Sequence, residues 1–277
     1  MQSLRALLAL GILIPITLVL IPVQHLAVRF NWRLSHQLPM RWHKFVCRIV
    51  GIRVVERGVP ATDRPLLITP NHASWMDIVA ISSILPVSFV AKSEVAKWPI
   101  FGTFARLQRT IFVDRERRSH TGKVAGEIAQ RLADGDAMVL FAEGTSGDGN
   151  TILPFRSALI GAARHAVTGS ESDRVWIQPM SVAYTRLHGM PMGRQFRHRA
   201  SWYGDMDLMP HLWAALREGA FDVVISWGDP IPFDPQTDRK GVARFAETSV
   251  RHMTATALLG RIVPDEEPKL LTADTDG

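Results

Sequence analysis

The stretch that decides the fold is Pro-Leu-Leu-Ile-Thr-Pro-Asn-His-Ala-Ser-Trp-Met-Asp-Ile-Val-Ala-Ile, residues 65–81. It opens with a short apolar run closed by Pro70, which predicts a buried strand that ends there. The apolar residues from Ile78 onward predict a helix over 78–85. A histidine, His72, and a carboxylate, Asp77, lie between these two elements. Strand-to-helix junctions of this kind often carry the chemistry of α/β proteins.

His72 and Asp77 are five positions apart, which on a regular helix leaves their side chains roughly 140° apart. The two side chains can therefore meet only if His72 precedes the helix and Asp77 points back from its first turn. In that arrangement the carboxylate fixes the tautomer of the imidazole, which then serves as a general base toward an alcohol. The alternative is structural, with Asn71 or Ser74 as a helix cap and Asp77 complementing the helix dipole.

The rest of the chain alternates between short apolar runs and amphipathic stretches. Strands are predicted at residues 52–56, 66–69, 87–91, 110–113, 137–141, 176–182 and 223–226. Helices are predicted at residues 78–85, 118–133, 157–167, 210–219 and 239–259. This alternation predicts a single α/β domain over residues 51–262, with a mainly parallel or mixed central sheet flanked by helices. We expect residues 263–277 to form a mobile acidic tail.

The N-terminal segment differs in character from this domain. No charged residue occurs from Ala6 to Val28, and ~20 apolar residues suffice to cross a bilayer. Pro15 and Pro22 leave a kinked helix that dips into one leaflet as an alternative. Residues 1–57 hold eight Lys or Arg and one acidic residue, whereas the remainder holds 24 basic and 25 acidic residues. Basic charge beside an apolar helix favours a membrane surface over nucleic acid as the partner.

Residues 1–50 are therefore predicted to form a hydrophobic membrane helix followed by a basic amphipathic helix. The positive-inside rule then puts the α/β domain on the cytoplasmic side of the cell inner membrane. Cys47 is the only cysteine and no His-x3-His pair occurs, so neither a disulfide nor a metal site is predicted. No Gly-x-Ser-x-Gly elbow of a serine hydrolase occurs either.

Two further stretches hold candidate binding residues. The Gly-rich loop Glu143-Gly-Thr-Ser-Gly-Asp-Gly-Asn follows a predicted strand and can bring backbone N–H groups to an anion. Its glycine spacing is that of a nucleotide-binding loop, but Asn150 stands where the lysine belongs, which disfavours ATP. Lys92 and Arg115 end predicted strands, and with Arg109 they are candidates for one cationic pocket. The alternative is a solvated charge cluster.

Residues 40–230 resemble the glycerolipid acyltransferases in four ordered blocks. These blocks are Asn71, His72 and Asp77; Ile111 to Arg115; Phe141, Glu143, Gly144 and Thr145, with Ala142 in place of a proline; and Ile177 to Met180. The resemblance implies O-acyl transfer from a thioester of acyl carrier protein or coenzyme A to a lyso-lipid hydroxyl. It implies His72 and Asp77 as the catalytic pair. The substrate-binding residues it implies are Lys92, Arg115, Glu143, Gly144, Thr145 and Ser146. No cofactor is implied, because the thioester is already activated.

Ser146 departs from the pattern of the phosphate-using members, which usually have an arginine at that position. Without that bidentate partner, and with Asp148 adding negative charge, a phosphate headgroup fits this loop poorly. The loop resembles instead the branch that acylates lyso-ornithine lipids, which we expect to be the preferred acceptor. Lysophosphatidic acid, alone or in addition, remains the alternative acceptor. A lipid-binding membrane protein without catalysis is the alternative outside the enzymes.

Overall fold

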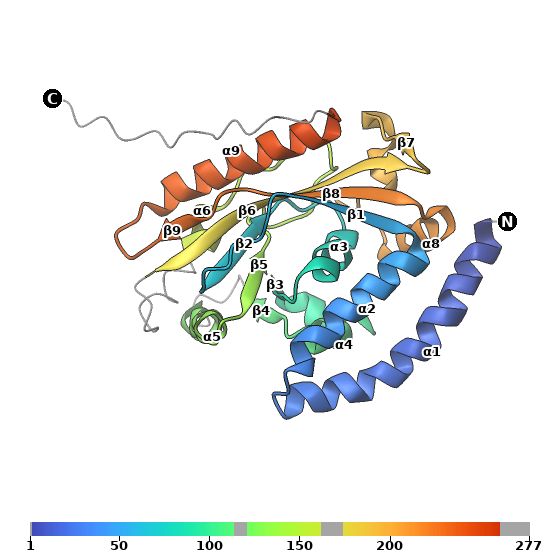
Figure 1. Ribbon diagram of the computed structural model, residues 1–277, viewed down its shortest axis with the longest axis horizontal. Helices are drawn as coiled ribbons and strands as arrows, with labels where there is room; N and C mark the ends of the chain where they lie inside the picture. The colour runs from blue at the N-terminus through green and yellow to red at the C-terminus, as the bar shows by residue number, and fades with distance from the viewer. Residues whose placement is uncertain (1, 114–120, 162–173, 261–277) are drawn as a thin grey trace.

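The computed structural model describes residues 2–113, 121–161 and 174–260, which form a mixed β-sheet with helices on both faces (Figure 1). The strand order is β1-β8-β6-β2-β5-β3-β4, with β7 and β9 paired to β6. The strands are β1 (Ile52–Arg57), β2 (Leu66–Pro70), β3 (Ser88–Lys92), β4 (Ile111–Val113), β5 (Ala137–Leu140), β6 (Val175–Leu187), β7 (Met190–Pro191), β8 (Phe221–Trp227) and β9 (Ile231–Phe233).

The sheet is parallel over the five strands from β6 to β4, and β8 then runs antiparallel to β6. Every residue of β2 and β5 is buried, as expected for strands covered on both faces. These observations confirm the predicted α/β class and the mainly parallel or mixed sheet. The parallel arrangement also brings the carboxyl ends of β2, β3, β4 and β5 to one edge.

Helices cover both faces of the sheet and enclose two apolar cores. One core contains residues of α2 (Leu34–Val50), α3 (Met76–Ile84) and α8 (Leu208–Glu218). The other contains residues of α5 (Thr121–Ala133), α6 (Ser157–Gly161) and α9 (Arg239–Leu258). The predicted helices therefore form, although parts of those expected at 118–133 and 157–167, and the tail from 263, lie outside the described residues.

Two short helical segments between β3 and β4 were not predicted: the 3-10 helix η1 (Ser93–Lys97) and α4 (Phe101–Leu107). Each is under two turns long, too short for a helical periodicity to be recognised. Strand β6 is also longer than predicted, because it reaches Leu187 through an irregularity at Tyr184 and Arg186.

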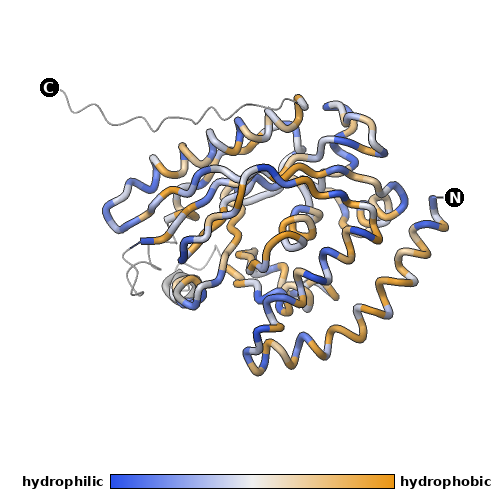
Figure 2. The backbone as a smooth tube through the Cα atoms, viewed as in Figure 1, coloured by the Kyte–Doolittle hydropathy of each residue, from blue (hydrophilic) through white to orange (hydrophobic). Residues whose placement is uncertain are grey.

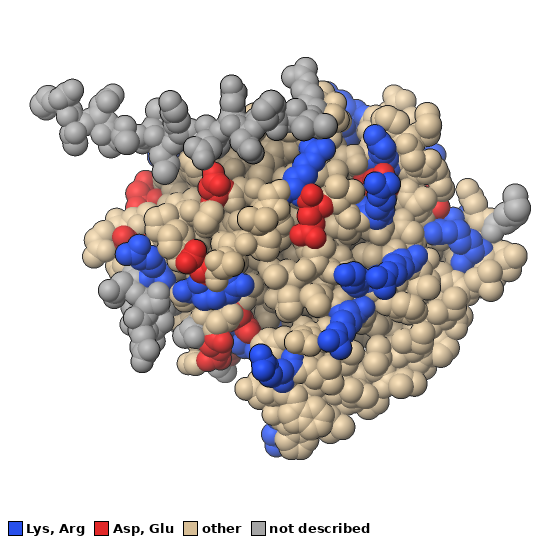
Figure 3. Space-filling view, viewed as in Figure 1, with Lys and Arg blue, Asp and Glu red and all other residues tan. Residues whose placement is uncertain are grey.

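The N-terminal helix α1 (Gln2–Arg29) is continuous through Pro15 and Pro22 and lies beside α2 (Figure 1). Arg5 donates hydrogen bonds to the carbonyl oxygens of Val50 and Leu216, in the last turns of α2 and α8. The rest of α1 is mostly exposed and apolar (Figure 2). Among the described residues, only this helix is long and apolar enough to cross a membrane. A row of basic side chains lies over α2, beside the uncharged surface of α1 (Figure 3).

Candidate active site

The His72 turn and the Glu143 loop meet at the carboxyl edge of the sheet. They follow β2 and β5, which are parallel neighbours with Leu66 opposite Ala137. The backbone N–H of His72 donates to Glu143 Oε1 at 2.9 Å, and the N–H of Gly147 donates to the His72 carbonyl at 2.8 Å. Two segments that lie 71 residues apart in the chain are thus held together by direct hydrogen bonds.

His72 and Asp77 meet in the geometry that their spacing requires. His72 lies in the turn before α3, and Asp77 lies in the first turn of that helix. The distance from His72 Nδ1 to Asp77 Oδ2 is 2.8 Å. The same oxygen accepts the backbone N–H groups of Ala73 at 2.7 Å and Ser74 at 2.9 Å. The bend into the helix therefore wraps around this carboxylate.

Asp77 is fully buried, and its other oxygen, Oδ1, accepts the hydroxyl proton of Tyr184 on β6 at 2.6 Å. Hydrogen bonds to a charged group are roughly twice as strong as neutral ones and offset part of the cost of its burial. The buried hydroxyl is correspondingly harder to ionise: burial, and then the charge of Asp77, raise the pKa of Tyr184 well above its usual value. Tyr184 therefore acts as a donor to the carboxylate.

The partners of His72 define which of its nitrogens carries the proton. A carboxylate can only accept, so Nδ1 holds the hydrogen and Nε2 keeps a free lone pair. Nε2 makes no hydrogen bond to any of the described residues, and the side chain is 17% exposed. The ring stacks on Phe141, with centroids 3.9 Å apart and planes 22° apart. The imidazole is thus fixed in tautomer by Asp77 and in orientation by Phe141.

Neither of the two predicted caps occupies the N-cap position of α3, which is Trp75 and has no side-chain cap. The hydroxyl of Ser74 accepts the Met76 N–H at 3.3 Å. The amide of Asn71 instead pairs with the backbone of Val182: it donates to the carbonyl at 3.0 Å and accepts the N–H at 2.8 Å. This side chain extends the β2–β6 ladder by one step, which anchors the start of the turn.

Glu143 is 2% exposed, and both of its oxygens accept backbone N–H groups, from His72 and from Leu153 at 3.1 Å. Burial raises the pKa of Glu143 to about 7; the charge of Asp77 adds to the rise and the two hydrogen bonds oppose it. Its carboxyl group thus contacts the backbone of the site and shapes the turn that carries His72.

The remaining predicted binding residues are distributed as follows. Gly144 is buried with a φ of 77°, a conformation that favours glycine. Thr145 is exposed and Ser146 is half-buried in the same loop. Lys92 is exposed at the carboxyl end of β3. Arg115, two residues beyond β4, lies outside the described residues, so its role stays a prediction.

The expectation that Arg109 joins Lys92 in one pocket is wrong. Val90 pairs with Ile111 and Lys92 with Val113, so Arg109 lies at the amino ends of these strands. There it forms an ion pair with Asp136 at 2.9 Å, at the opposite edge of the sheet from His72. Arg109 precedes β4 whereas Lys92 ends β3, and the parallel register of these strands separates the two residues.

Tyr184 and the stacking role of Phe141 were also missed. Tyr184 is 107 residues from Asp77 and belongs to a strand whose alternation only predicts burial. A polar aromatic residue in a buried strand is the available signal, since its hydroxyl needs a partner. Among the described residues, no cluster of three or more His, Cys, Asp or Glu is arranged to hold a metal ion.

Comparison with known proteins places this fold and site in a defined class. A family model described as Acyltransferase matches residues 48–183, which include the His72 turn and the Glu143 loop. The lyso-ornithine lipid O-acyltransferase of Brucella abortus is 48% identical over 263 residues, covering 95% of this chain and 98% of that protein. The protein of the same name from Rhizobium meliloti is 45% identical over 250 residues, covering 90% and 86%.

The chain therefore belongs to the acyltransferase family and is an enzyme that transfers acyl groups. A solved structure, the 1-acyl-sn-glycerophosphate acyltransferase PlsC of Thermotoga maritima, matches with a TM-score of 0.56 and 20% identity. It covers 95% of this chain and 100% of that one. At this identity the likeness shows the fold alone, and it agrees with the predicted glycerolipid acyltransferase architecture.

Proposed function

We propose that this enzyme moves a fatty acyl group from an acyl thioester to the hydroxyl of a lyso-ornithine lipid, with His72 as the general base. The observation that carries the proposal is the His72–Asp77 contact, which leaves Nε2 as a fixed proton acceptor at a partly exposed position. The names of the two relatives support the acceptor. Ser146, in the position of a phosphate-binding arginine, supports it independently.

In the proposed reaction, His72 Nε2 takes the proton of the acceptor hydroxyl while its oxygen attacks the thioester carbonyl. The tetrahedral intermediate collapses, the carbon–sulfur bond breaks, and the departing thiolate takes the proton from the imidazolium. Asp77 holds the tautomer and stabilises the imidazolium between these steps. General base catalysis of this kind contributes ~10²–10⁴-fold to the rate.

Three residues have positioning roles in this proposal. Tyr184 holds Asp77 Oδ1, Phe141 holds the imidazole plane, and Glu143 holds the backbone of His72. Lys92, Gly144, Thr145 and Ser146 belong to segments at the carboxyl edge of the sheet. These residues and Arg115 are proposed to contact the substrates. The donor, an acyl group on acyl carrier protein or coenzyme A, is likewise proposed, as is the absence of a cofactor.

The exposed apolar helix α1 supports a membrane-associated enzyme, since acceptor and product are both lipids. The basic residues of α2 favour the anionic cytoplasmic face of the inner membrane. Helix α1 contacts α2 and α8, and Arg5 is hydrogen-bonded to both, which holds the membrane-associated helix beside the α/β domain.

The acceptor is tested by parallel turnover assays with the full-length protein in lipid vesicles. Lyso-ornithine lipid and lysophosphatidic acid are offered separately, each with acyl carrier protein and coenzyme A thioesters of one chain length. We expect kcat/KM to favour lyso-ornithine lipid at least tenfold with either donor. A preference for lysophosphatidic acid would refute the proposed acceptor, and binding without turnover of any thioester would refute the enzymatic role.

A further inference from the structure

A carboxylate in the loop after β5 and a guanidinium from a later segment both contact the side-chain amide of Asn150. The Asn150 side chain donates to Asp148 Oδ2 at 3.2 Å and accepts from Arg197 Nη1 at 2.8 Å. Because its nitrogen faces the carboxylate and its oxygen faces the guanidinium, Asn150 orients both charged groups. Arg197 comes from the 3-10 helix η3 (Arg194–Arg199), 47 residues further along the chain.

Arg197 is 8% exposed, yet its Nε has no hydrogen-bond partner among the residues that the structure describes. No carboxylate of the described residues forms an ion pair with it. Buried charges are normally paired, and an arginine presents five donors in a planar fork that matches a carboxylate. Arg109, whose side chain is 11% exposed, shows the usual case, since Asp136 pairs with it. Arg197 thus has donors to spare for an anion.

Both segments of this pair are hydrogen-bonded to the turn that holds His72. The N–H of Gly147 donates to the His72 carbonyl and the N–H of Trp202 to the Ala73 carbonyl, each at 2.8 Å. The hydroxyl of Ser201 joins the two segments by donating to the Asp148 carbonyl at 3.0 Å. The charged pair is therefore built onto the same support as the proposed base.

Asp148 remains ionised in this loop. Burial opposes its charge, but hydrogen bonds from the Asn150 and Thr151 backbone and side chains outweigh burial and lower the pKa of Asp148. The loop thus presents one negative group and, across the Asn150 amide, one positive group. A phosphomonoester carries only negative charge and would be repelled by Asp148. An N-acylated ornithine carries both a free carboxylate and an ammonium group.

We propose that Arg197, oriented by Asn150, binds the carboxylate of an amino-acid headgroup on the acceptor, and that Asp148 attracts the ammonium group of that headgroup. This inference rests on the proposed function and deepens it, because it assigns the residues that recognise the acceptor. It also accounts for Ser146: the cation for the headgroup comes from η3 and is matched to a carboxylate rather than a phosphate.

The test compares Arg197→Gln with Arg199→Gln, a matched control on the same helix whose exposed guanidinium pairs with Glu218 at 3.0 Å. Full-length protein in vesicles is assayed with lyso-ornithine lipid and with its carboxyl methyl ester. We expect R197Q to lower kcat/KM at least tenfold for the acid and threefold or less for the ester. R199Q should change either value less than twofold.

Equal losses of R197Q on acid and ester would overturn the inference, since they indicate a structural role, and so would no loss on either. Should R197Q fail to fold, Arg197→Lys keeps the charge without the planar fork and should lose activity on the acid alone. Asp148→Asn should improve the use of lysophosphatidic acid relative to lyso-ornithine lipid at least threefold. Wild-type turnover of lyso-ornithine lipid tests the proposed function, whereas the variant ratios test only this subsite.

Discussion

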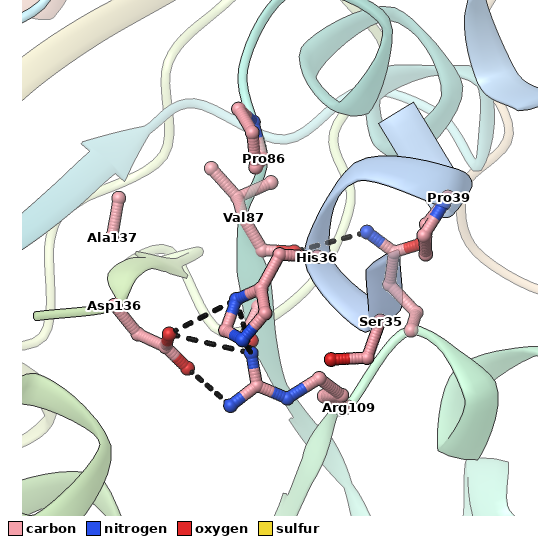
Figure 4. A pocket seen from close by; sticks show the side chains of 10 residues that line it. Ser35, His36, Pro39, Pro86, Val87, Arg109, Asp136 and Ala137 are labelled. Atoms are coloured by element: carbon pink, nitrogen blue, oxygen red, sulfur yellow. Dashed lines mark hydrogen bonds and ion pairs between the residues drawn. The ribbon is translucent and has the colours of Figure 1, made fainter. Parts of the chain in front are cut away.

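The sheet carries a His–Asp contact at each of its two edges. At the carboxyl edge, His72 Nδ1 lies 2.8 Å from Asp77 Oδ2; at the amino edge, His36 Nδ1 lies 3.3 Å from Asp136 Oδ1. The second contact is part of a cluster that joins the start of α2, the turn before β4 and the start of β5 (Figure 4). The two contacts are similar in residue type and differ in their neighbours.

Asp77 is surrounded by neutral donors, whereas Asp136 is shared by cations. Arg109 and Arg131 approach Asp136 at 2.9 and 3.6 Å, and the Arg109 guanidinium lies against the His36 ring. Burial, and then the charges of Arg109 and Arg131, lower the pKa of His36, against the opposing effect of Asp136. A carboxylate committed to two arginines has little left to stabilise an imidazolium. The neighbours of such a pair, more than its distance, decide whether it serves chemistry or structure.

Replacing each histidine in turn should give the largest difference between the two edges. We expect His72→Gln to lower kcat by ~10²–10⁴-fold, because the proton acceptor is lost. His36→Gln should keep kcat within a few-fold, since it lies at the other edge. Turnover assays on both variants, with circular dichroism to verify folding, measure this. Substantial activity in H72Q, or equal losses in both variants, would contradict the assignment of His72 as the base.

At the amino edge, replacing Asp136 should lower the stability of the fold and leave kcat unchanged. Asp136→Asn leaves Arg109 buried without its counter-charge, and breaking a buried pair costs about 3–5 kcal/mol of unfolding free energy. Thermal or denaturant unfolding in detergent micelles measures the loss, and kcat of the folded protein at low temperature should be retained. A lower kcat with unchanged stability would contradict the structural role assigned to the cluster around Asp136.

Tyr184→Phe tests the contribution of the hydrogen bond to Asp77 at the carboxyl edge. It removes the donor to Asp77 Oδ1 and leaves a buried acceptor short of a partner, which costs about 1–3 kcal/mol of stability. We expect a loss of kcat of tenfold or less, because the His72 contact remains. Tyr203→Phe, at the only other tyrosine, is the matched control. An effect no larger than that of Y203F would remove Tyr184 as a positioning residue.

The two edges should also differ in the sign of their pH dependence. Glu143 has a pKa of about 7 in the fold against 4.5 when unfolded, so the folded state binds its proton more tightly. Its contribution to stability therefore decreases as pH rises from 4.5 to 7. The pKa of His36 is lowered by folding, so its contribution is lost as pH falls below 6.5.

This difference is tested by measuring the melting temperatures of wild type and two variants from pH 5 to 8. Glu143→Gln should remove part of the decline toward neutral pH, and His36→Gln should remove part of the decline toward acid. Each difference is expected to be a few degrees or less. Parallel curves for wild type and variants would show that neither group contributes to the pH dependence.

Local sequence was enough to predict the contact between His72 and Asp77 at the carboxyl edge of the sheet. The spacing of His72 and Asp77 across a strand-to-helix junction required one geometry, and the chain adopts it. Short apolar runs alternating with amphipathic stretches predicted the α/β sheet, because β2 and β5 consist of consecutive residues that are all buried. The uncharged run at the N-terminus likewise predicted α1, since length and hydropathy are local properties.

Which distant side chains complete each site depends on the tertiary structure. Tyr184 reaches Asp77 and Arg197 reaches Asn150 across 107 and 47 residues, and no local pattern encodes such pairings. Arg109 looked like a partner of Lys92 until strand register put it at the opposite edge. Periodicity reports which face a residue occupies, whereas the choice of neighbours depends on the strand order and register that the packed core selects.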